Sequence, residues 1–316
     1  MKVETTTEVP LFHQALPWYR KLFVFIQRIV ARVISSNISN AAKVITYYVL
    51  LGFFPLIIFI GNMLPYLGLD AKTVLEYLEM AFPEQILPLV RPIVVSLLGK
   101  SSSSLLSIGV IATLWAGSRA INAIRNSMND AYQIDSSNIY SDVPIQNAIM
   151  RRFLAFLLTF IFVMSVMLII GAFTFGQTFL EWFVPTFKLS NKILVVFSKW
   201  KWPVVVTVTL AVLLFLQYFL PNIHLKFWTV LPGTLFTAGG WLVLTQGFSL
   251  YVHYFGRSFN SYGTIGTLII GLLWLNFAAT LLMVGTVINA IFNESWHGEP
   301  QQTTSGGRLA QFLKNR

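Results

Sequence analysis

The sequence predicts an all-α fold: a polytopic membrane protein with about six transmembrane helices. Of its 316 residues, 55% are hydrophobic and only 11% are charged, whereas soluble domains carry about 25% charged residues. Long stretches also lack any charged residue, namely 153–180, 202–225, 227–256 and 258–293. A helix needs about 20 such residues to cross the hydrocarbon core of a bilayer. The chain has no cysteine, which excludes disulfides, thiolate metal sites and cysteine nucleophiles.

The chain divides into a cytoplasmic N-terminal segment (1–40), a transmembrane domain (41–293) and a flexible cytoplasmic tail (294–316). Residues 1–15 are polar and are expected to be loose. Residues 17–36 have helical periodicity, with apolar side chains on one face and basic ones on another. Such a helix fits the membrane interface, where its basic face meets anionic headgroups. An ordinary cytoplasmic helix packed on its own bundle explains the pattern equally well.

The spans follow from the uncharged stretches and their flanking signals. The first carries Pro55, which removes a backbone hydrogen bond and is expected to kink the helix. The second follows four serines, which are good N-cap residues. Between these two spans, residues 66–100 hold four acidic residues and three prolines and are predicted to form an external helical segment. The six spans cover residues 42–64, 104–122, 153–177, 202–220, 228–251 and 266–292.

The basic residues of short loops set the orientation, because cytoplasmic loops carry the excess of lysine and arginine. The N-terminal segment and the loops after the second and fourth spans are basic, which predicts that both termini are cytoplasmic. The loop 179–201 disagrees, since it carries four lysines but would lie outside. The expected location is the plasma membrane of a bacterium. This topology, rather than nucleic-acid binding, explains the net charge of +10.

Polar residues gather where the second span ends, in residues 114–133. On a continuing helix, one stripe holds Ser118, Asn122, Arg125 and Asn129. Arg119 lies beside this stripe, and an arginine presents a planar fork that suits phosphate. We therefore expect an anionic lipid headgroup to be bound by Arg119, Asn122, Arg125 and Asn129. The alternative is positive-inside anchoring of the helix, with an ion pair to Asp130 or Asp142.

A second polar cluster precedes the sixth span, in residues 254–268. Arg257 and Tyr262 are candidates for contact with an anionic headgroup of the outer leaflet, and Gly263 permits close packing of the backbone. The alternative is a tight interfacial turn that is anchored by the tyrosine.

Uncharged polar residues inside the fifth and sixth spans, Asn289 among them, are predicted to join helices by hydrogen bonds. A polar cavity is the alternative. Small residues around Pro232 and Gly233 predict close helix packing and a helix broken at the proline. No aspartate, glutamate or lysine lies deep in a span, so the titratable group that proton-coupled transport generally needs is missing.

The sequence predicts no catalytic, metal or cofactor site, and we do not expect an enzyme. The four histidines are scattered, and no metal-binding helix motif, phosphate loop or dinucleotide fingerprint is present. A metal-dependent hydrolase or nuclease would need a cluster of carboxylates or histidines.

Four segments (41–59, 114–132, 231–252 and 262–290) resemble, in this order, the YihY/virulence factor BrkB family of inner-membrane proteins. The resemblance spans about residues 20–292. It touches Tyr47, Tyr48, Pro55, Trp115, Arg119, Asn129, Pro232, Gly233, Tyr262, Gly263, Trp274, Gly285 and Asn289. The sequence departs from the family at Val287, where a glutamate is frequent, and at Gly52, where a serine is more usual.

The resemblance implies a helical bundle that moves lipid or a lipid-linked precursor, in a family once mislabelled as ribonuclease BN. We therefore expect a plasma-membrane protein that moves or hands over an anionic lipid or lipid-linked envelope precursor. A non-transporting scaffold for envelope-synthesis proteins is the alternative, and ribonuclease activity is not expected. The expected partners are membrane lipids with anionic headgroups. Self-association and envelope-synthesis partners stay open.

Overall fold

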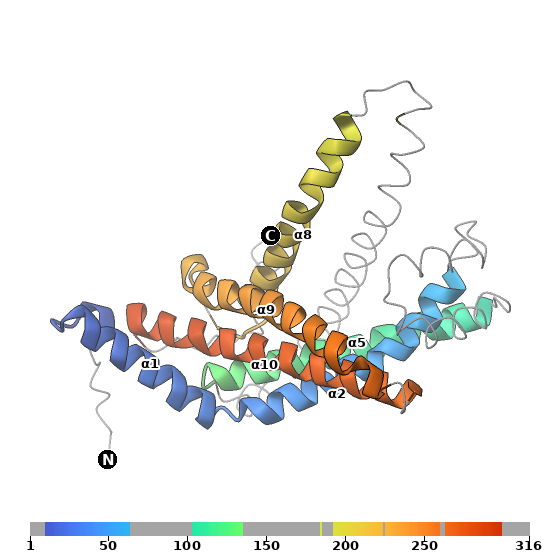
Figure 1. Ribbon diagram of the computed structural model, residues 1–316. Helices are drawn as coiled ribbons and strands as arrows, with labels where there is room; N and C mark the ends of the chain where they lie inside the picture. The colour runs from blue at the N-terminus through green and yellow to red at the C-terminus, as the bar shows by residue number, and fades with distance from the viewer. Residues whose placement is uncertain are drawn as a thin grey trace, which may run out of the picture.

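A computed structural model of the chain describes residues 10–63, 103–134, 184, 192–223, 225–259 and 263–298 (Figure 1). Its elements are η1 (Leu11–His13), α1 (Trp18–Ser35), α2 (Ile38–Met63), α5 (Ser103–Ala131), α8 (Lys192–Phe219), α9 (Phe227–Phe259) and α10 (Gly263–His297). These described parts contain helices and no strand. The predicted external segment and the predicted third span, residues 66–100 and 153–177, lie outside the described residues.

The other five predicted spans are helical, which confirms the all-helical class for this part of the chain. Among the described residues, two helical stretches are long and apolar enough to cross a membrane: Phe227–Tyr251 of α9 and Ile269–His297 of α10. A third span is counted if α1 and the Ile38–Leu56 part of α2 form one bent unit, with 57° between them. In α8 the apolar portion is the shorter stretch Val206–Phe219. The total of six spans therefore stays a prediction.

α1 and α2 meet at a sharp corner of two residues, Ser36 and Asn37. The backbone N–H of Ser36 still donates to the carbonyl of Arg32, as in a helix. Asn37 then takes φ of 51°, in the left-handed region that asparagine adopts more readily than most residues. This conformation ends α1 and turns the chain into α2.

α2 and α5 form an antiparallel pair, because their contacts run in opposite directions along the two helices. A Cβ atom added at Gly52 would lie 3.6 Å from the Cβ of Ala116, and one added at Gly109 would lie 3.0 Å from the backbone nitrogen of Phe59. Of these two positions, Gly109 is the more crowded, and almost no space is left there for a side chain. At Gly52 the contact is ordinary, so the Cβ of the serine usual in the family would fit.

The buried core lies at one end of the bundle. It joins the start of α2 and the ends of α5, α8 and α10, with Ile45, Met128, Leu213 and Met283 among its members. A second cluster, around Val230 at the start of α9, continues it. A six-span path with alternating directions would bring these same five helix ends to one side of the membrane. In Figure 1, α8 leaves the other helices above this region, while α2, α5, α9 and α10 run side by side.

Several helices extend beyond the predicted limits. α9 is continuous through Pro232, so the predicted break at this residue is wrong; the proline lies near the helix start, where few backbone hydrogen bonds are lost. The predicted loop before the sixth span is largely helix, since α9 runs to Phe259 and α10 begins at Gly263. α8 begins at Lys192, inside the predicted loop 179–201.

Parts of both polar terminal segments pack against the bundle, in contrast to what the sequence suggests. α10 continues to His297, through residues placed in the flexible tail, because its last turn packs against η1 and α1. Leu11 is buried, and the Phe12 ring lies 5.8 Å from Phe292 and 5.5 Å from Trp296. The expectation of a loose segment is therefore wrong for residues 10–15, which pack against the end of α10.

Candidate functional site

A chain of buried hydrogen bonds joins α8, α9 and α10 near the core. The Asn289 side chain accepts a hydrogen bond of 2.6 Å from the backbone N–H of Gly233 and donates to the Gln217 side chain. Gln217 in turn donates to the Thr237 hydroxyl, 3.2 Å away, and Thr237 donates to the Gly233 carbonyl, 2.8 Å away. In the structure Asn289 thus joins α10 to both α8 and α9. Gln217 was not predicted as a site residue, because it lies near the end of a span, where polar residues are common.

Replacing Asn289 by alanine is expected to lower the free energy of unfolding by about 1–3 kcal/mol, because it leaves buried donors and acceptors without partners. The measurement is the midpoint of thermal unfolding in a defined detergent. Asn276→Ala is the matched control, since it removes the same side chain from the same helix at a partly exposed position. Equal midpoints for the two variants would contradict a bridging role for Asn289.

Arg32 links three helices at the same end of the bundle. Its guanidinium makes two hydrogen bonds of 2.9 Å with the carboxylate of Glu294 in α10 and one of 3.2 Å with the carbonyl of Ala131, the last residue of α5. Only 12% of the Arg32 side chain and 17% of the Glu294 side chain are exposed. The sequence placed Arg32 on the basic face of α1 and left two roles open, contact with headgroups or packing on the bundle. The structure gives Arg32 a carboxylate partner inside the protein, which fits packing on the bundle.

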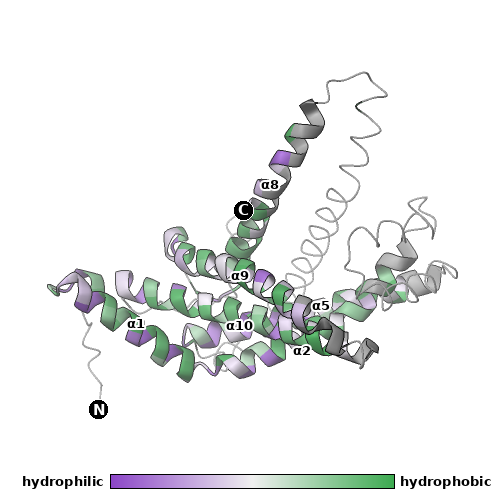
Figure 2. Cartoon of the chain, in the orientation of Figure 1, coloured by the Kyte–Doolittle hydropathy of each residue, from purple (hydrophilic) through white to green (hydrophobic). Residues whose placement is uncertain are grey.

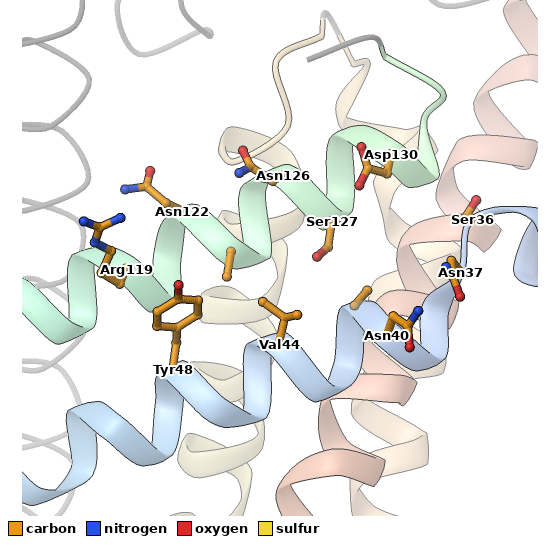
Figure 3. Close-up of a pocket in the computed structure, with 12 residues that line it drawn as sticks. Ser36, Asn37, Asn40, Val44, Tyr48, Arg119, Asn122, Asn126, Ser127 and Asp130 are labelled. Carbon is orange, nitrogen blue, oxygen red and sulfur yellow. The ribbon is translucent and has the colours of Figure 1, made fainter. Parts of the chain in front are cut away.

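A polar pocket of about 430 Å³ lies between the start of α2 and the second half of α5 (Figure 3). It is lined by Ser36, Asn37, Asn40, Ala41, Val44, Tyr48, Arg119, Asn122, Ala123, Asn126, Ser127 and Asp130. Four asparagines and two serines offer both donors and acceptors of hydrogen bonds. Figure 3 shows Tyr48 of α2 reaching toward Arg119 of α5 at one end, with Asp130 at the other end.

The charged groups of the pocket stand apart along α5. The Arg119 guanidinium lies over the Trp115 ring, 5.6 Å from its centroid, in a cation–π contact. Asp130 is eleven residues further along the helix, or about 16 Å at a rise of 1.5 Å per residue. Protein atoms that displace water from the Asp130 carboxyl raise its pKa above the ordinary value. The Arg119 end is therefore the part of the pocket suited to an anion.

A single stripe of α5 changes from apolar to polar on its way into the pocket. Its members, three or four residues apart, are Ile108, Ile111, Trp115, Arg119, Asn122, Asn126 and Asp130. The first three are large apolar side chains that are 56–69% exposed, and the last four line the pocket. We call this set the α5 stripe. Its apolar part suits a hydrocarbon chain, and its polar part suits a charged headgroup.

The structure distributes the sequence-predicted site residues over several environments. Arg119 and Asn122 line the pocket, but Arg125 does not. Asn129 is buried and accepts a hydrogen bond of 2.9 Å from the backbone N–H of Asn222, so it anchors the link between α8 and α9. The expected stripe and the α5 stripe therefore share Asn122. At the other positions the residue that lines the pocket is the next one in the chain, namely Arg119, Asn126 or Asp130.

The prediction for Arg257 concerns the opposite end of the bundle. Arg257 belongs to the last turns of α9 rather than to a loop. Tyr262 and Asp142 lie outside the described residues. The α2 half of the pocket, with Asn40 and Tyr48, was not singled out as a site. Its signal was an asparagine- and serine-rich helix start (36–40) that would face the end of the next span in a hairpin.

The described helices and the uncharged stretches together define an integral membrane protein of the α-helical class. The family described as Virulence factor BrkB matches residues 29–308. The chain therefore belongs to the BrkB family, and the resemblance seen in the sequence is confirmed. The ribonuclease-like protein YfkH of Bacillus subtilis is 28% identical over 270 residues, which cover 85% of this chain and 95% of YfkH. No solved structure matches the chain.

Proposed function

We propose that this protein binds an anionic membrane lipid or lipid-linked precursor at the α5 stripe and moves it or hands it over. The headgroup occupies the α2–α5 pocket, and a hydrocarbon chain lies along the apolar part of the stripe. The observation that carries the proposal is the continuity between this exposed apolar surface and Arg119. The proposed role is binding and transfer rather than catalysis, at the cytoplasmic side of the bacterial plasma membrane.

The chemistry of the pocket favours an anion with further hydrogen-bonding groups. A guanidinium binds phosphate through two parallel N–H donors, and such charge-assisted bonds are about twice as strong as neutral ones. Beyond Arg119, the amides of Asn122 and Asn126 can donate to oxygen atoms or accept from hydroxyls. The predicted topology supports access from the cytoplasm, since the pocket joins the start of the first span to the end of the second.

Alanine at Arg119 is expected to reduce the amount of bound anionic lipid by about tenfold or more, because a hydrogen bond to a charged group contributes roughly 1.5–3 kcal/mol. The measurement is native mass spectrometry of the lipids retained by the purified protein. Arg119→Lys keeps the charge but loses the fork, so it is expected to retain an intermediate amount.

Lys43→Ala is the matched control, because Lys43 is an exposed cation on α2 that does not line the pocket. This variant is expected to retain the same lipids as the natural protein. If Arg119→Ala retains as much anionic lipid as Lys43→Ala, the pocket does not bind headgroups.

Transfer is tested separately in liposomes that contain only the purified protein. A transporter moves a labelled anionic lipid between leaflets faster than empty liposomes do, and the Arg119→Ala variant loses the difference. A scaffold binds lipid without moving it. Incubation of the same preparation with labelled RNA tests the activity that the name of YfkH suggests, and cleavage that survives further purification would overturn the proposed role.

A further inference from the structure

α1 exposes a second apolar face that points away from the bundle. Figure 2 shows hydrophobic and hydrophilic residues side by side along this helix. The residues of this outer face are Tyr19, Leu22, Phe23, Ile26, Val30 and Ile34. Each of them is at least half exposed, from 50% for Leu22 to 75% for Ile34. We call this set the outer face of α1.

The two other sides of α1 have different neighbours. Phe25, Ile29 and Val33 pack against the buried core, so the apolar arc is wider than the bundle can cover. Arg20, Ala31 and Ser35 are exposed on the side opposite the core. The helix therefore has an inner face on the protein, an outer apolar face and a third, more polar face.

The position of α1 beside the first predicted span indicates that its outer face meets the membrane. Only Ser36 and Asn37 separate α1 from α2, the first predicted span, and the two helices are bent by 57°. Exposed apolar side chains continue across this corner, since Val44 is 46% and Tyr47 is 60% exposed. A helix with a wide apolar arc beside a charged one lies at a membrane interface with its apolar side about 5–10 Å deep.

We infer that the outer face of α1 is inserted into the leaflet on the side of the N-terminus, among headgroups and the first methylenes of the acyl chains. In this position α1 fixes the depth of the adjoining pocket in the membrane, because Ser36 and Asn37 line the pocket directly after α1 ends. Arg20 stays in contact with water and anionic headgroups. This placement of α1 does not depend on whether Arg119 binds a lipid.

The absence of cysteine from the natural chain makes the test direct. Single cysteines replace Ile26 or Val30 on the outer face, and Ala31→Cys is the matched control on the next residue. Each variant is labelled with a nitroxide and reconstituted into liposomes that contain anionic phospholipid. Spin relaxation by oxygen, which concentrates in the bilayer, is compared with relaxation by a water-soluble nickel chelate.

The ratio of oxygen to nickel accessibility is expected to be higher at residues 26 and 30 than at residue 31, because the apolar side of an interfacial helix lies among the acyl chains. Equal ratios at the three positions would overturn the inference and place the outer face in water. Low accessibility to both reagents, with spin–spin broadening at residues 26 and 30, would overturn it in favour of a second copy of the chain. Unchanged thermal unfolding midpoints show that the variants are folded.

Discussion

Alanine in place of Gly233 or Gly285 is expected to lower the free energy of unfolding by more than about 3 kcal/mol, or to prevent folding. The reason is the contact between α9 and α10. A Cβ at residue 233 would overlap the carbonyl oxygen of Gly285 and lie 2.6 Å from the side-chain carbon of Asn289. A Cβ at residue 285 would overlap the Thr237 hydroxyl and lie 2.6 Å from the Gly233 carbonyl oxygen. Because backbone atoms are involved, no rotamer change relieves the overlap.

Two other glycines of the same helices provide the controls. A Cβ at Gly239 in α9 or at Gly271 in α10 would meet nothing within 4 Å. Alanine there is expected to leave the unfolding midpoint unchanged, or to raise the stability by up to about 1 kcal/mol, since alanine favours helix more than glycine does. The measurements are the yield of monodisperse protein and the midpoint of thermal unfolding. Equal behaviour of Gly233→Ala and Gly239→Ala would show that α9 and α10 do not cross at residues 233 and 285.

Removing Arg32 is the second change with a large expected effect. Arg32→Ala leaves the Glu294 carboxylate without its cation and the Ala131 carbonyl without its donor. Loss of one partner from a buried ion pair costs about 3–5 kcal/mol, and for this slightly exposed pair we expect about 2–4 kcal/mol. The unfolding midpoint in detergent measures the loss. Arg20→Ala, which removes the same charge from an exposed position of α1, is expected to change it little.

A double variant separates the pair interaction from the burial of one charge. Replacing both Arg32 and Glu294 by methionine removes the two charges together, and the double variant is expected to be more stable than Arg32→Ala. The single variants Arg32→Met and Glu294→Met complete the cycle: if their losses add up in the double variant, the two side chains do not interact in solution.

The fold class and most helices were predictable because a helix that crosses the hydrocarbon core must be almost free of charged residues. Uncharged stretches located α9 and α10 well, and proline positions were of less use: α9 passes through Pro232 near its start. The helix ends were less predictable because they lie outside the apolar stretches. Near the end of α10, Phe292 and Trp296 pack against the aromatic ring of Phe12, a contact that no local pattern indicates.

Only the α5 side of the candidate site was predictable from the sequence. The periodicity of α5 located Arg119 and Asn122, but it could not decide which face of α5 turns inward. In the structure Asn129 turns inward and accepts a hydrogen bond from Asn222, which is 93 residues away in the chain. The partner of Arg32 could not be predicted either. A basic residue on an amphipathic helix can contact a headgroup as well as a distant carboxylate, and nothing in the sequence pattern points to Glu294.

The contact between Arg32 and Glu294 also imposes an order on biosynthesis. Its two residues are 262 positions apart. Chains grow at about 5–20 residues per second, so Glu294 is synthesised on the order of tens of seconds after Arg32. During that time α1 has left the ribosome, but the last turns of α10, against which it packs, have not been made. Docking of α1 against α10 is thus a late event that follows synthesis of the last turns of α10.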